Sequence, residues 1–313
     1  MDVIYEIYKK IKNMEIRGAG RIGRAAAKAL KNYAKSIADL EDNKFKNKMI
    51  DAGNILKSAR PTAVSLPNAV KYVLNGLNDK NPKEAVINKA DEFIKSSLEA
   101  TKKIGEIGSN RIKDGYTILT HCNSEAALNI IKTAYRNGKN IKVICTETRP
   151  RNQGYLTAKD LADEGIDTTL IVDSAVRYFI KEVDLVVVGA DAITSNGCLV
   201  NKIGTSQIAL IAHERRVPFL TAAETYKFHP KTIVGELIDI EERSPNEIHI
   251  FEEEYTDKIK LRNPAFDITP AQYIDGIITE IGIIPPQGAW YIIEKYFGDL
   301  FNEYEKMKKN EKL

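Results

Sequence analysis

Two residues of this chain combine the chemistry of a base and of an acid with positions that favour proton transfer. Cys122 lies just after an apolar run, residues 116–120, and before a helix-like segment, residues 123–136. Because a helix N-terminus lowers the pKa of a thiol, we expect Cys122 to form a thiolate that acts as a base. Asp191 follows the most apolar run of the chain, residues 186–190, where poor solvation raises the pKa of a carboxyl group. A carboxylic acid of raised pKa suits a general acid, so the two residues predict a proton-transfer site.

Each of these residues also has an ordinary structural explanation. A free cysteine is more often a small buried apolar side chain, as we expect for Cys145, and an aspartate after a strand often caps a helix. Hydrolysis is disfavoured, because the chain has neither a Gly-x-Ser-x-Gly turn nor a His-Glu-x-x-His motif. We therefore expect acid–base catalysis by Cys122 and Asp191, with no metal ion and no nucleotide cofactor.

A basic segment with glycines near the N-terminus predicts a phosphate site. Arg17, Arg21 and Arg24 lie among glycines ahead of a helix-like segment, whose free N–H groups and positive dipole end attract anions. The planar guanidinium group of arginine binds phosphate through two hydrogen bonds. A helix-capping loop is the structural alternative. Arg60, which precedes a proline at another expected helix start, and Lys227, in a polar loop, are ambiguous when taken alone.

Residues 18–23 also match the Gly-x-Gly-x-x-Gly pattern of dinucleotide-binding proteins. That pattern is informative only between a strand and a helix. Residues 4–16 are charged and have helical periodicity, and the acidic Asp39 and Glu41 lie in another helix-like stretch. We therefore expect no dinucleotide at this loop.

The apolar pattern divides the chain into two parts. Up to about residue 110, apolar residues such as Ala26, Leu30 and Ala34 recur at helical spacing, which predicts a helical N-terminal domain, residues 1–110. Short apolar runs then alternate with helix-like segments, which predicts an α/β domain with a mainly parallel sheet, residues 111–313. The two parts meet within residues 104–114. The five expected strands are residues 116–120, 141–145, 169–172, 185–188 and 218–221.

Polar residues follow all five expected strands. In an open parallel sheet, ligands bind beyond the carboxyl ends of the strands, so these side chains are expected to meet at one edge. In chain order they are His121, Cys122, Asn123 and Ser124, then Thr146, Glu147, Thr148 and Arg149, then Asp173 and Ser174, then Asp191, and finally Glu224.

The composition disfavours several classes of protein. A net charge of +3 with 28% charged residues gives no bulk charge for binding nucleic acid. The 313 residues allow a core that is stable without crosslinks, and the three cysteines, with no Cys-x-x-Cys pair, argue against a disulfide framework and a zinc ribbon. No apolar stretch reaches the roughly 18 residues of a membrane span, and the N-terminus lacks the pattern of a signal peptide. We expect a cytoplasmic protein that binds neither nucleic acid nor membranes, with a solvated lysine-rich end at residues 305–313.

Six short segments occur in the order found in one known family. Together they resemble the family that includes the regulatory subunits of initiation factor 2B and related sugar-phosphate isomerases. The resemblance covers nearly the whole chain, and it implies a helical N-terminal domain followed by a Rossmann-like domain. The segments are Arg-Gly-Ala-Gly (17–20), Arg-Pro-Thr-Ala-Val (60–64), Thr-His-Cys-Asn (120–123), Glu-Thr-Arg-Pro (147–150), Gly-Ala-Asp (189–191) and Asn-Lys-Ile-Gly-Thr (201–205).

Within this family, a cysteine and an aspartate at the positions of Cys122 and Asp191 are typical of the isomerases. Residues 123–125 (Asn-Ser-Glu) and 17–21 (Arg-Gly-Ala-Gly-Arg) resemble the archaeal ribose-1,5-bisphosphate isomerases. Methylthioribose-1-phosphate isomerases instead carry Arg-Gly-Ala-Pro in the first loop. The resemblance implies conversion of ribose 1,5-bisphosphate to ribulose 1,5-bisphosphate, which supplies a carboxylase (RuBisCO) during AMP breakdown. A bisphosphate also needs two anion sites, and the chain has two basic regions, whereas a methylthio group needs an apolar pocket.

The same resemblance implies the substrate contacts and the assembly. It implies a homodimer or homohexamer, and activation by a nucleotide such as AMP, whose site the sequence does not locate. Two alternatives stay open: a methylthioribose-1-phosphate isomerase, or a regulatory binding subunit of the initiation factor 2B type. The implied substrate contacts are Arg17, Gly18, Ala19, Gly20, Arg60, Asn201, Lys202 and Lys227.

Overall fold

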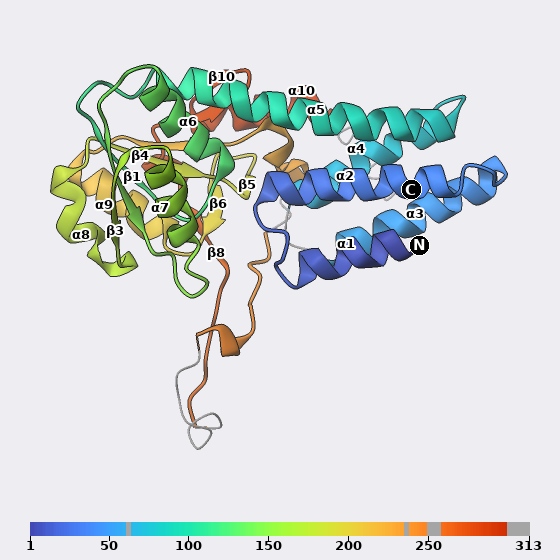
Figure 1. The fold of residues 1–313 in the computed structure, drawn as a ribbon, viewed down its shortest axis with the longest axis horizontal. Helices are drawn as coiled ribbons and strands as arrows, with labels where there is room; N and C mark the ends of the chain where they lie inside the picture. Colours follow the sequence, from blue (N-terminus) through green and yellow to red (C-terminus); the bar gives the residue numbers. More distant parts are fainter. Residues whose placement is uncertain (61–63, 235–237, 249–257, 299–313) are drawn as a thin grey trace, which may run out of the picture. The chain divides into compact units, whose positions relative to one another are not determined.

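The chain forms two compact units, Met1–Lys103 and Ile104–Leu313 (Figure 1). The computed structural model describes residues 1–60, 64–234, 238–248 and 258–298. Two segments singled out in the sequence, the Pro-Thr-Ala segment after Arg60 and the lysine-rich end, lie outside the described residues. No helix among the described residues is long and apolar enough to cross a membrane.

The first unit consists of helices, which confirms the prediction from its apolar spacing. Ala26, Leu30 and Ala34 lie buried along one face of the second helix, which packs against the fourth. The last helix of this unit continues past the division at residue 103, so that Ile104 belongs to the core of the second unit. The helices are α1 (Asp2–Lys12), α2 (Ala19–Ser36), α3 (Asp42–Ser58), α4 (Ser65–Leu74) and α5 (Pro82–Ser109).

The glycine-containing loop near the N-terminus joins two helices. It follows α1, and α2 begins directly after Gly18, whose φ is 84°. Backbone in this region of φ favours glycine, because a side chain would clash there. A strand does not precede this loop, so its surroundings differ from those of a dinucleotide-binding turn, as expected from the helical periodicity of residues 4–16.

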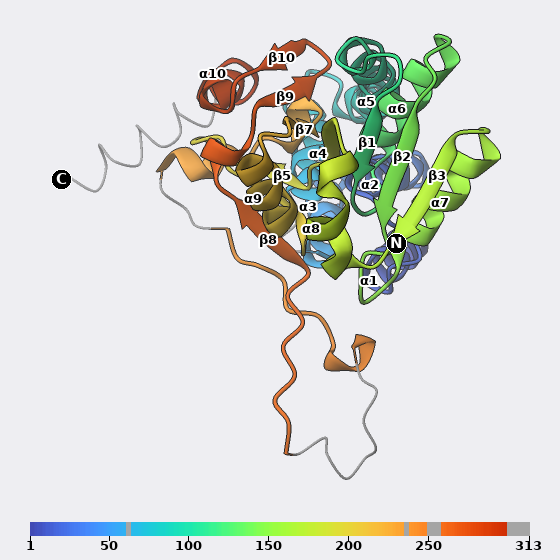
Figure 2. The same cartoon turned by 90° about the vertical axis from the view of Figure 1, so that its left-hand side faces the viewer.

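The second unit is built on a seven-stranded sheet with the order β10-β9-β7-β4-β1-β2-β3 (Figure 2). Its strands pair in parallel except for β10, which is antiparallel to β9. All five strands expected from the apolar runs are present, and they end at the same edge, which confirms the predicted sheet. The strands are β1 (Thr117–Thr120), β2 (Lys142–Thr146), β3 (Asp167–Ile171), β4 (Leu185–Gly189), β7 (Phe219–Ala222), β9 (Gly276–Thr279) and β10 (Gly282–Ile284).

Both faces of the sheet are covered by helices. Alternate residues of β4 point to opposite faces: Val186 and Val188 belong to one apolar cluster, and Leu185 and Val187 to the other. The first cluster includes residues of α8 (Val176–Phe179), α9 (Thr205–Arg215) and α10 (Ala289–Phe297), and the second those of α6 (Glu125–Arg136) and α7 (Gln153–Asp163). Burial on both faces explains why the central strands are continuous apolar runs.

A small antiparallel sheet, which the sequence did not predict, lies beyond the end of β4. It has the order β5-β6-β8, with β5 (Ala192–Ile193), β6 (Leu199–Lys202) and β8 (Phe266–Thr269). Asn201 and Lys202 lie at the end of β6, and Asn201 is in register with Asp267. Long-range pairing with β8 therefore sets the position of both predicted substrate contacts.

Candidate active site

Cys122 and Asp191 follow two neighbouring strands at the point where the sheet reverses its direction of growth. β1 pairs with β4. On one side of β1 the chain adds β2 and then β3, and on the other side it adds β4, then β7 and then β9. Open α/β sheets bind ligands at such a switch point. The end of β4 contacts the loop that follows β1, because a Cβ atom on Gly189 would overlap with Ser124. The fold thus brings the predicted base and acid to the same part of the sheet edge.

Asp191 lies between β4 and β5. Its N–H donates to the carbonyl oxygen of Val200 at 2.9 Å, within the hairpin formed by β5 and β6. A strand rather than a helix follows it, so the alternative that Asp191 caps a helix is wrong. Its side chain is partly exposed at the sheet edge.

Cys122 has an unusual backbone conformation; the residue as a whole is partly exposed, while its thiol is buried. Its φ is 67°, in the left-handed region that residues with a side chain rarely adopt. Its N–H donates to Oγ1 of Thr148 at 2.9 Å, and its carbonyl oxygen accepts from Oγ1 of Thr157 at 2.7 Å. Side chains of two separate segments therefore hold both backbone polar groups of this residue.

The expected lowering of the thiol pKa is wrong. Burial raises the pKa of Cys122 to about 11, although the positive charge of Lys202 and a hydrogen bond from the backbone of Asn123 lower it. Helix α6 begins only at Glu125, and Ser124 caps it by accepting from the N–H of Ala127 at 3.3 Å. The thiol therefore lies ahead of the cap instead of in the first helical turn, and burial outweighs the helix dipole.

His121, next to the thiol, connects β1 to the turn after β6. Its Nε2 lies 2.9 Å from the carbonyl oxygen of Ile203 and its Nδ1 2.5 Å from Oγ1 of Thr146. A carbonyl oxygen can only accept, so Nε2 carries the proton and Nδ1 accepts from the hydroxyl. Burial lowers the pKa of His121 to about 4, which keeps the ring neutral near pH 7. The imidazole is thus a structural connection rather than a charged group.

Asp173 fixes the loop after β2. Its Oδ1 accepts from the N–H of Thr148 at 2.8 Å, and its Oδ2 accepts from the N–H of Arg149 at 2.7 Å. Thr148 is fully buried and has a φ of 61°. Polar residues that follow β1, β2 and β3 therefore form one connected set of hydrogen bonds around Cys122.

The turn after β6 presents a buried cation to this site. Lys202 is 8% exposed, its Nζ lies 4.9 Å from the centre of the Phe266 ring, and its charge lowers the pKa of Cys122. Asn201 donates from Nδ2 to Oγ1 of Thr205 at 3.0 Å. Lys202 forms no ion pair with any residue that the structure describes.

Asp267 on β8 holds this turn in place. Its carboxylate accepts from the N–H of Gly204 at 2.7 Å and from the N–H of Ser206 at 3.1 Å, at the start of α9. Gly204 has a φ of 103°, and a Cβ atom there would lie 3.2 Å from Cε1 of His121, so the turn closely approaches the ring. Burial raises the pKa of Asp267 to about 6, although these hydrogen bonds and Lys202 lower it.

Lys227 is buried after β7 and paired with a carboxylate, not solvated. Its Nζ lies 2.7 Å from Oε2 of Glu224, and both side chains are almost fully buried. Burial raises the pKa of Glu224, but Lys227, together with hydrogen bonds from the backbone and from Tyr226, holds that pKa below its usual value. Glu280, after β9, accepts from the N–H of Thr225 at 3.1 Å, and burial raises its pKa.

The remaining predicted site residues belong to the first unit. Gly18 is the N-cap residue of α2, and Ala19 and Gly20 form its first turn, without a side-chain cap. Arg17 donates from Nε to the carbonyl oxygen of Met14 at 2.7 Å, and Arg60, after α3, is 7% exposed. Within the second unit, Cys122, Asp191 and Lys227 follow β1, β4 and β7 of the seven-stranded sheet, whereas Asn201 and Lys202 lie at the end of β6 in the small sheet. The charges of Lys202 and Asp191 both act on the Cys122 thiol.

Sequence reasoning missed several residues that shape the site. It placed His121, Thr148 and Asp173 at strand ends but gave them no role. Asp267 escaped notice because β8 was not predicted. The only signal for it in the sequence is an acidic residue between apolar neighbours, Phe266 and Ile268, which is too common to be informative.

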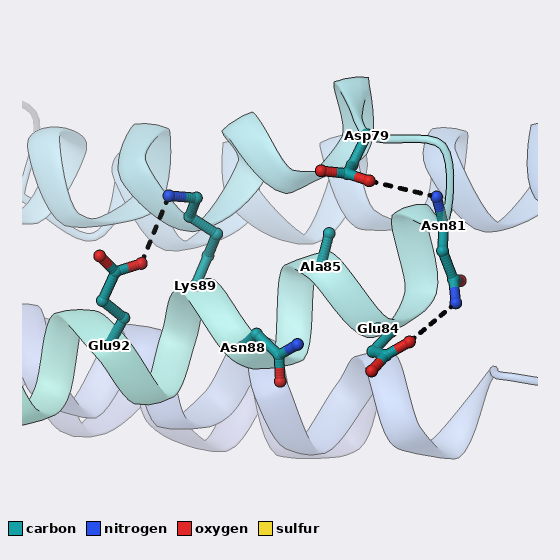
Figure 3. A pocket seen from close by; sticks show the side chains of 7 residues that line it. All are labelled: Asp79, Asn81, Glu84, Ala85, Asn88, Lys89 and Glu92. Atoms are coloured by element: carbon teal, nitrogen blue, oxygen red, sulfur yellow. Dashed lines mark hydrogen bonds and ion pairs between the residues drawn. The ribbon is translucent and has the colours of Figure 1, made fainter.

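One surface hollow occurs in the helical unit (Figure 3). It has a volume of about 240 Å³ and lies along the start of α5. Neighbouring side chains already pair within it, as Lys89 does with Glu92 and Asn81 with Glu84. Its lining contains none of the predicted site residues, and no group of three His, Cys, Asp or Glu side chains that could hold a metal ion occurs among the described residues. The lining residues are Asp79, Asn81, Glu84, Ala85, Asn88, Lys89 and Glu92.

Comparison with known proteins shows the family. The sequence model of the "Initiation factor 2 subunit family" matches residues 15–286. The chain belongs to this family. It is 78% identical over 298 residues to "Ribose 1,5-bisphosphate isomerase" of Methanocaldococcus jannaschii. The aligned residues cover 95% of this chain and 96% of that protein.

More distant members of the family share the fold under other names. A "Methylthioribose-1-phosphate isomerase" of Acetivibrio thermocellus is 42% identical over 300 residues, covering 90% of this chain and 88% of that protein. The crystal structure of translation initiation factor eIF-2B from Pyrococcus horikoshii superposes with a TM-score of 0.80 at 33% identity, covering 90% of this chain and 97% of that one. Members of this family therefore keep one architecture, although they are named for different functions.

Proposed function

We propose that this chain is a ribose 1,5-bisphosphate isomerase, which converts ribose 1,5-bisphosphate to ribulose 1,5-bisphosphate. The observation that carries the proposal is its 78% identity, over 95% of the chain, to a protein of that name. The site supports it independently, because a thiol and a carboxyl group follow neighbouring strands at the switch point of the sheet. An aldose–ketose isomerisation moves one proton between adjacent carbons, and it needs one base and one acid.

In the proposed mechanism, Asp191 is the acid and Cys122 the base. The carboxyl group of Asp191 donates its proton to the ring oxygen, and the bond between that oxygen and C1 breaks. The thiolate of Cys122 removes the proton from C2, which leaves an enol phosphate with a double bond between C1 and C2. The thiol then returns its proton to C1, and the hydroxyl proton on C2 goes back to Asp191. The ketose forms and both groups regain their starting states.

The thiolate needs a nearby positive charge, because burial raises the pKa of Cys122 to about 11. Lys202 supplies such a charge, since its effect on that pKa is to lower it. Lys202 is itself buried and has no ion pair among the described residues, so its charge remains available to the thiolate and to substrate phosphate.

Eight residues are proposed to bind the substrate. A sugar bisphosphate carries two widely separated anionic groups, and each needs its own set of donors. The glycine loop offers free N–H groups at the start of α2, next to a guanidinium group. In the second unit, the ends of β6 and β7 supply two ammonium groups and a side-chain amide. The residues are Arg17, Gly18, Ala19, Gly20, Arg60, Asn201, Lys202 and Lys227.

The deciding experiment measures turnover of ribose 1,5-bisphosphate in a coupled assay by the wild type, Cys122→Ser and Asp191→Asn, with chelator present. We expect turnover by the wild type that is indifferent to chelator, and a loss of at least about 100-fold in each variant. Methylthioribose 1-phosphate is the competing substrate. If only that sugar reacts, the substrate assignment is wrong; if neither reacts, a regulatory binding role replaces the enzymatic one.

Assembly, activation and cellular role are proposals that rest on the family resemblance. We propose a cytoplasmic homodimer or homohexamer, activated by AMP, whose product is consumed by a carboxylase in the breakdown of AMP. The mass in solution, measured by light scattering, tests the assembly, and a mass equal to one chain would contradict it. Turnover with and without AMP tests the activation.

A further inference from the structure

The two loops around the Cys122 thiol contain a pair of strained residues. Cys122 has a φ of 67° and Thr148 a φ of 61°, and neither is a glycine. Such conformations persist only where the surrounding structure holds them, and they concentrate at functional sites. The groups that hold these two residues are therefore candidates for a role in the reaction.

The hydroxyl of Thr157 on α7 holds Cys122 from one side. Its Oγ1 donates to the carbonyl oxygen of Cys122 at 2.7 Å and accepts from Nδ2 of Asn123 at 3.0 Å. Thr157 is 1% exposed, so water does not replace a lost hydroxyl without rearrangement. Both hydrogen bonds act on the segment that carries the thiol.

The hydroxyl of Thr148 holds Cys122 from the other side. It accepts the N–H of Cys122 at 2.9 Å and lies 3.3 Å from the carbonyl oxygen of Thr146, to which it donates. Asp173 in turn accepts from the N–H groups of Thr148 and Arg149, so this threonine is itself fixed. The backbone of Cys122 is thus held between two buried hydroxyl groups from different segments.

We propose that Thr148 and Thr157 are positioning residues that hold the Cys122 thiol for proton abstraction, an inference that rests on the proposed isomerase function. A base must lie within hydrogen-bonding reach of the proton it removes, and a small displacement of a catalytic group greatly reduces the rate. Removal of either hydroxyl lets the loop relax from its left-handed conformation. The thiol then leaves its position and becomes better solvated.

The test compares Thr157→Val with Thr157→Ser, which keeps the hydroxyl. We expect Thr157→Val to lower kcat by about 10- to 100-fold with KM little changed, while Thr157→Ser retains most of the activity. Alkylation of Cys122 by iodoacetamide at pH 8, followed by peptide mass spectrometry, is expected to become faster in Thr157→Val. Solvation returns the thiol pKa toward its usual value, so activity and thiol reactivity change in opposite directions.

Two further variants make the test specific. Thr148→Val removes the other hydroxyl, and we expect the same two changes. Thr168→Val is the matched control, because its Oγ1 donates to the carbonyl oxygen of Ile166 at 2.8 Å near the amino end of β3, the opposite end of the sheet from Cys122. That variant should leave both kcat and the alkylation rate unchanged.

The possible outcomes separate the inference from the proposed function. Unchanged kcat and unchanged alkylation in both folded valine variants would overturn the positioning role, as would an equal loss in Thr157→Ser. If the wild type does not turn over the bisphosphate, the proposed function fails and alkylation alone decides whether the two hydroxyls hold the thiol.

Discussion

Two buried lysines at the same side of the sheet have opposite electrostatic surroundings. Lys202, at the end of β6, and Lys227, after β7, are 8% and 4% exposed. Lys227 is neutralised by Glu224 at 2.7 Å, whereas Lys202 has no ion pair among the described residues and faces an aromatic ring. Asp267 is the nearby carboxyl group whose pKa Lys202 lowers, but it does not form an ion pair with this lysine. Lys202 lowers the pKa of Cys122, so this lysine carries the charge that the proposed mechanism needs beside the thiolate.

The carboxyl groups beside the two lysines differ in the same way. Asp267 accepts hydrogen bonds from the backbone of the turn that follows Lys202, and burial raises its pKa to about 6. Glu224 is also buried, yet Lys227 holds its pKa below the usual value. The turn after β6 therefore changes its charge near pH 6, where Asp267 gains or loses its proton, whereas Glu224 and Lys227 stay ionised as a pair.

Lys227→Met is expected to have the largest effect, because it removes the cation that forms an ion pair with the buried carboxylate of Glu224. The free energy of unfolding should fall by about 3–5 kcal/mol. Urea denaturation measures the change. Lys202→Met serves as the matched control, since Lys202 forms no ion pair among the described residues and acts on Asp267 only at longer range, and it should be much less destabilising. Equal losses in the two variants would contradict the comparison.

Lys202→Met should instead reduce activity. Without the positive charge, the pKa of Cys122 rises further, and kcat at pH 8 is expected to fall by about 100-fold. Lys202→Arg keeps the charge and should retain more activity than the methionine variant. Steady-state kinetics with ribose 1,5-bisphosphate decides the point, and full activity in Lys202→Met would show that the thiolate does not depend on this lysine.

Asp267 should make the stability of the protein depend on pH. The folded chain binds the proton of Asp267 more tightly than the unfolded chain does, because its pKa is raised from 3.8 to about 6. This group therefore lowers stability as pH rises from about 4 to about 6, by an amount on the order of 3 kcal/mol, and adds no further change above that range. Asp267→Asn removes this contribution, so the free energy of unfolding, measured across these pH values, should change with a more positive slope against pH than in the wild type. An identical slope in both proteins would refute the assignment.

Tyr226→Phe should have the smallest effect. The hydroxyl of Tyr226 donates to Oε1 of Glu224 at 3.2 Å, and a lost hydrogen bond to a charged group costs about 1.5–3 kcal/mol. We expect a value at the lower end of that range, since Lys227 still neutralises the carboxylate. Thermal unfolding measures the loss, and kcat should not change. A loss as large as that of Lys227→Met would mean that the hydroxyl, rather than the ammonium, keeps Glu224 ionised.

Apolar spacing predicted much of the fold, because burial on one helix face or on both sheet faces leaves a periodic pattern. The helical first unit and the five parallel strands follow from it. The apolar spacing did not predict β6 and β8, because short antiparallel strands depend on pairing between distant segments, such as Asn201 with Asp267. The start of α6 was placed too early, and with it the expected influence of the helix dipole on Cys122.

The sequence by itself determined which residues carry the chemistry: a cysteine and an aspartate after apolar runs, and basic residues near glycines. Their identity and order along the chain are local properties. Only the tertiary structure decided that β1 and β4 are neighbours, that burial raises the thiol pKa, and that one lysine is neutralised while the other is not. These outcomes depend on long-range packing, which sets solvation and the distances between charges, and no local pattern records either.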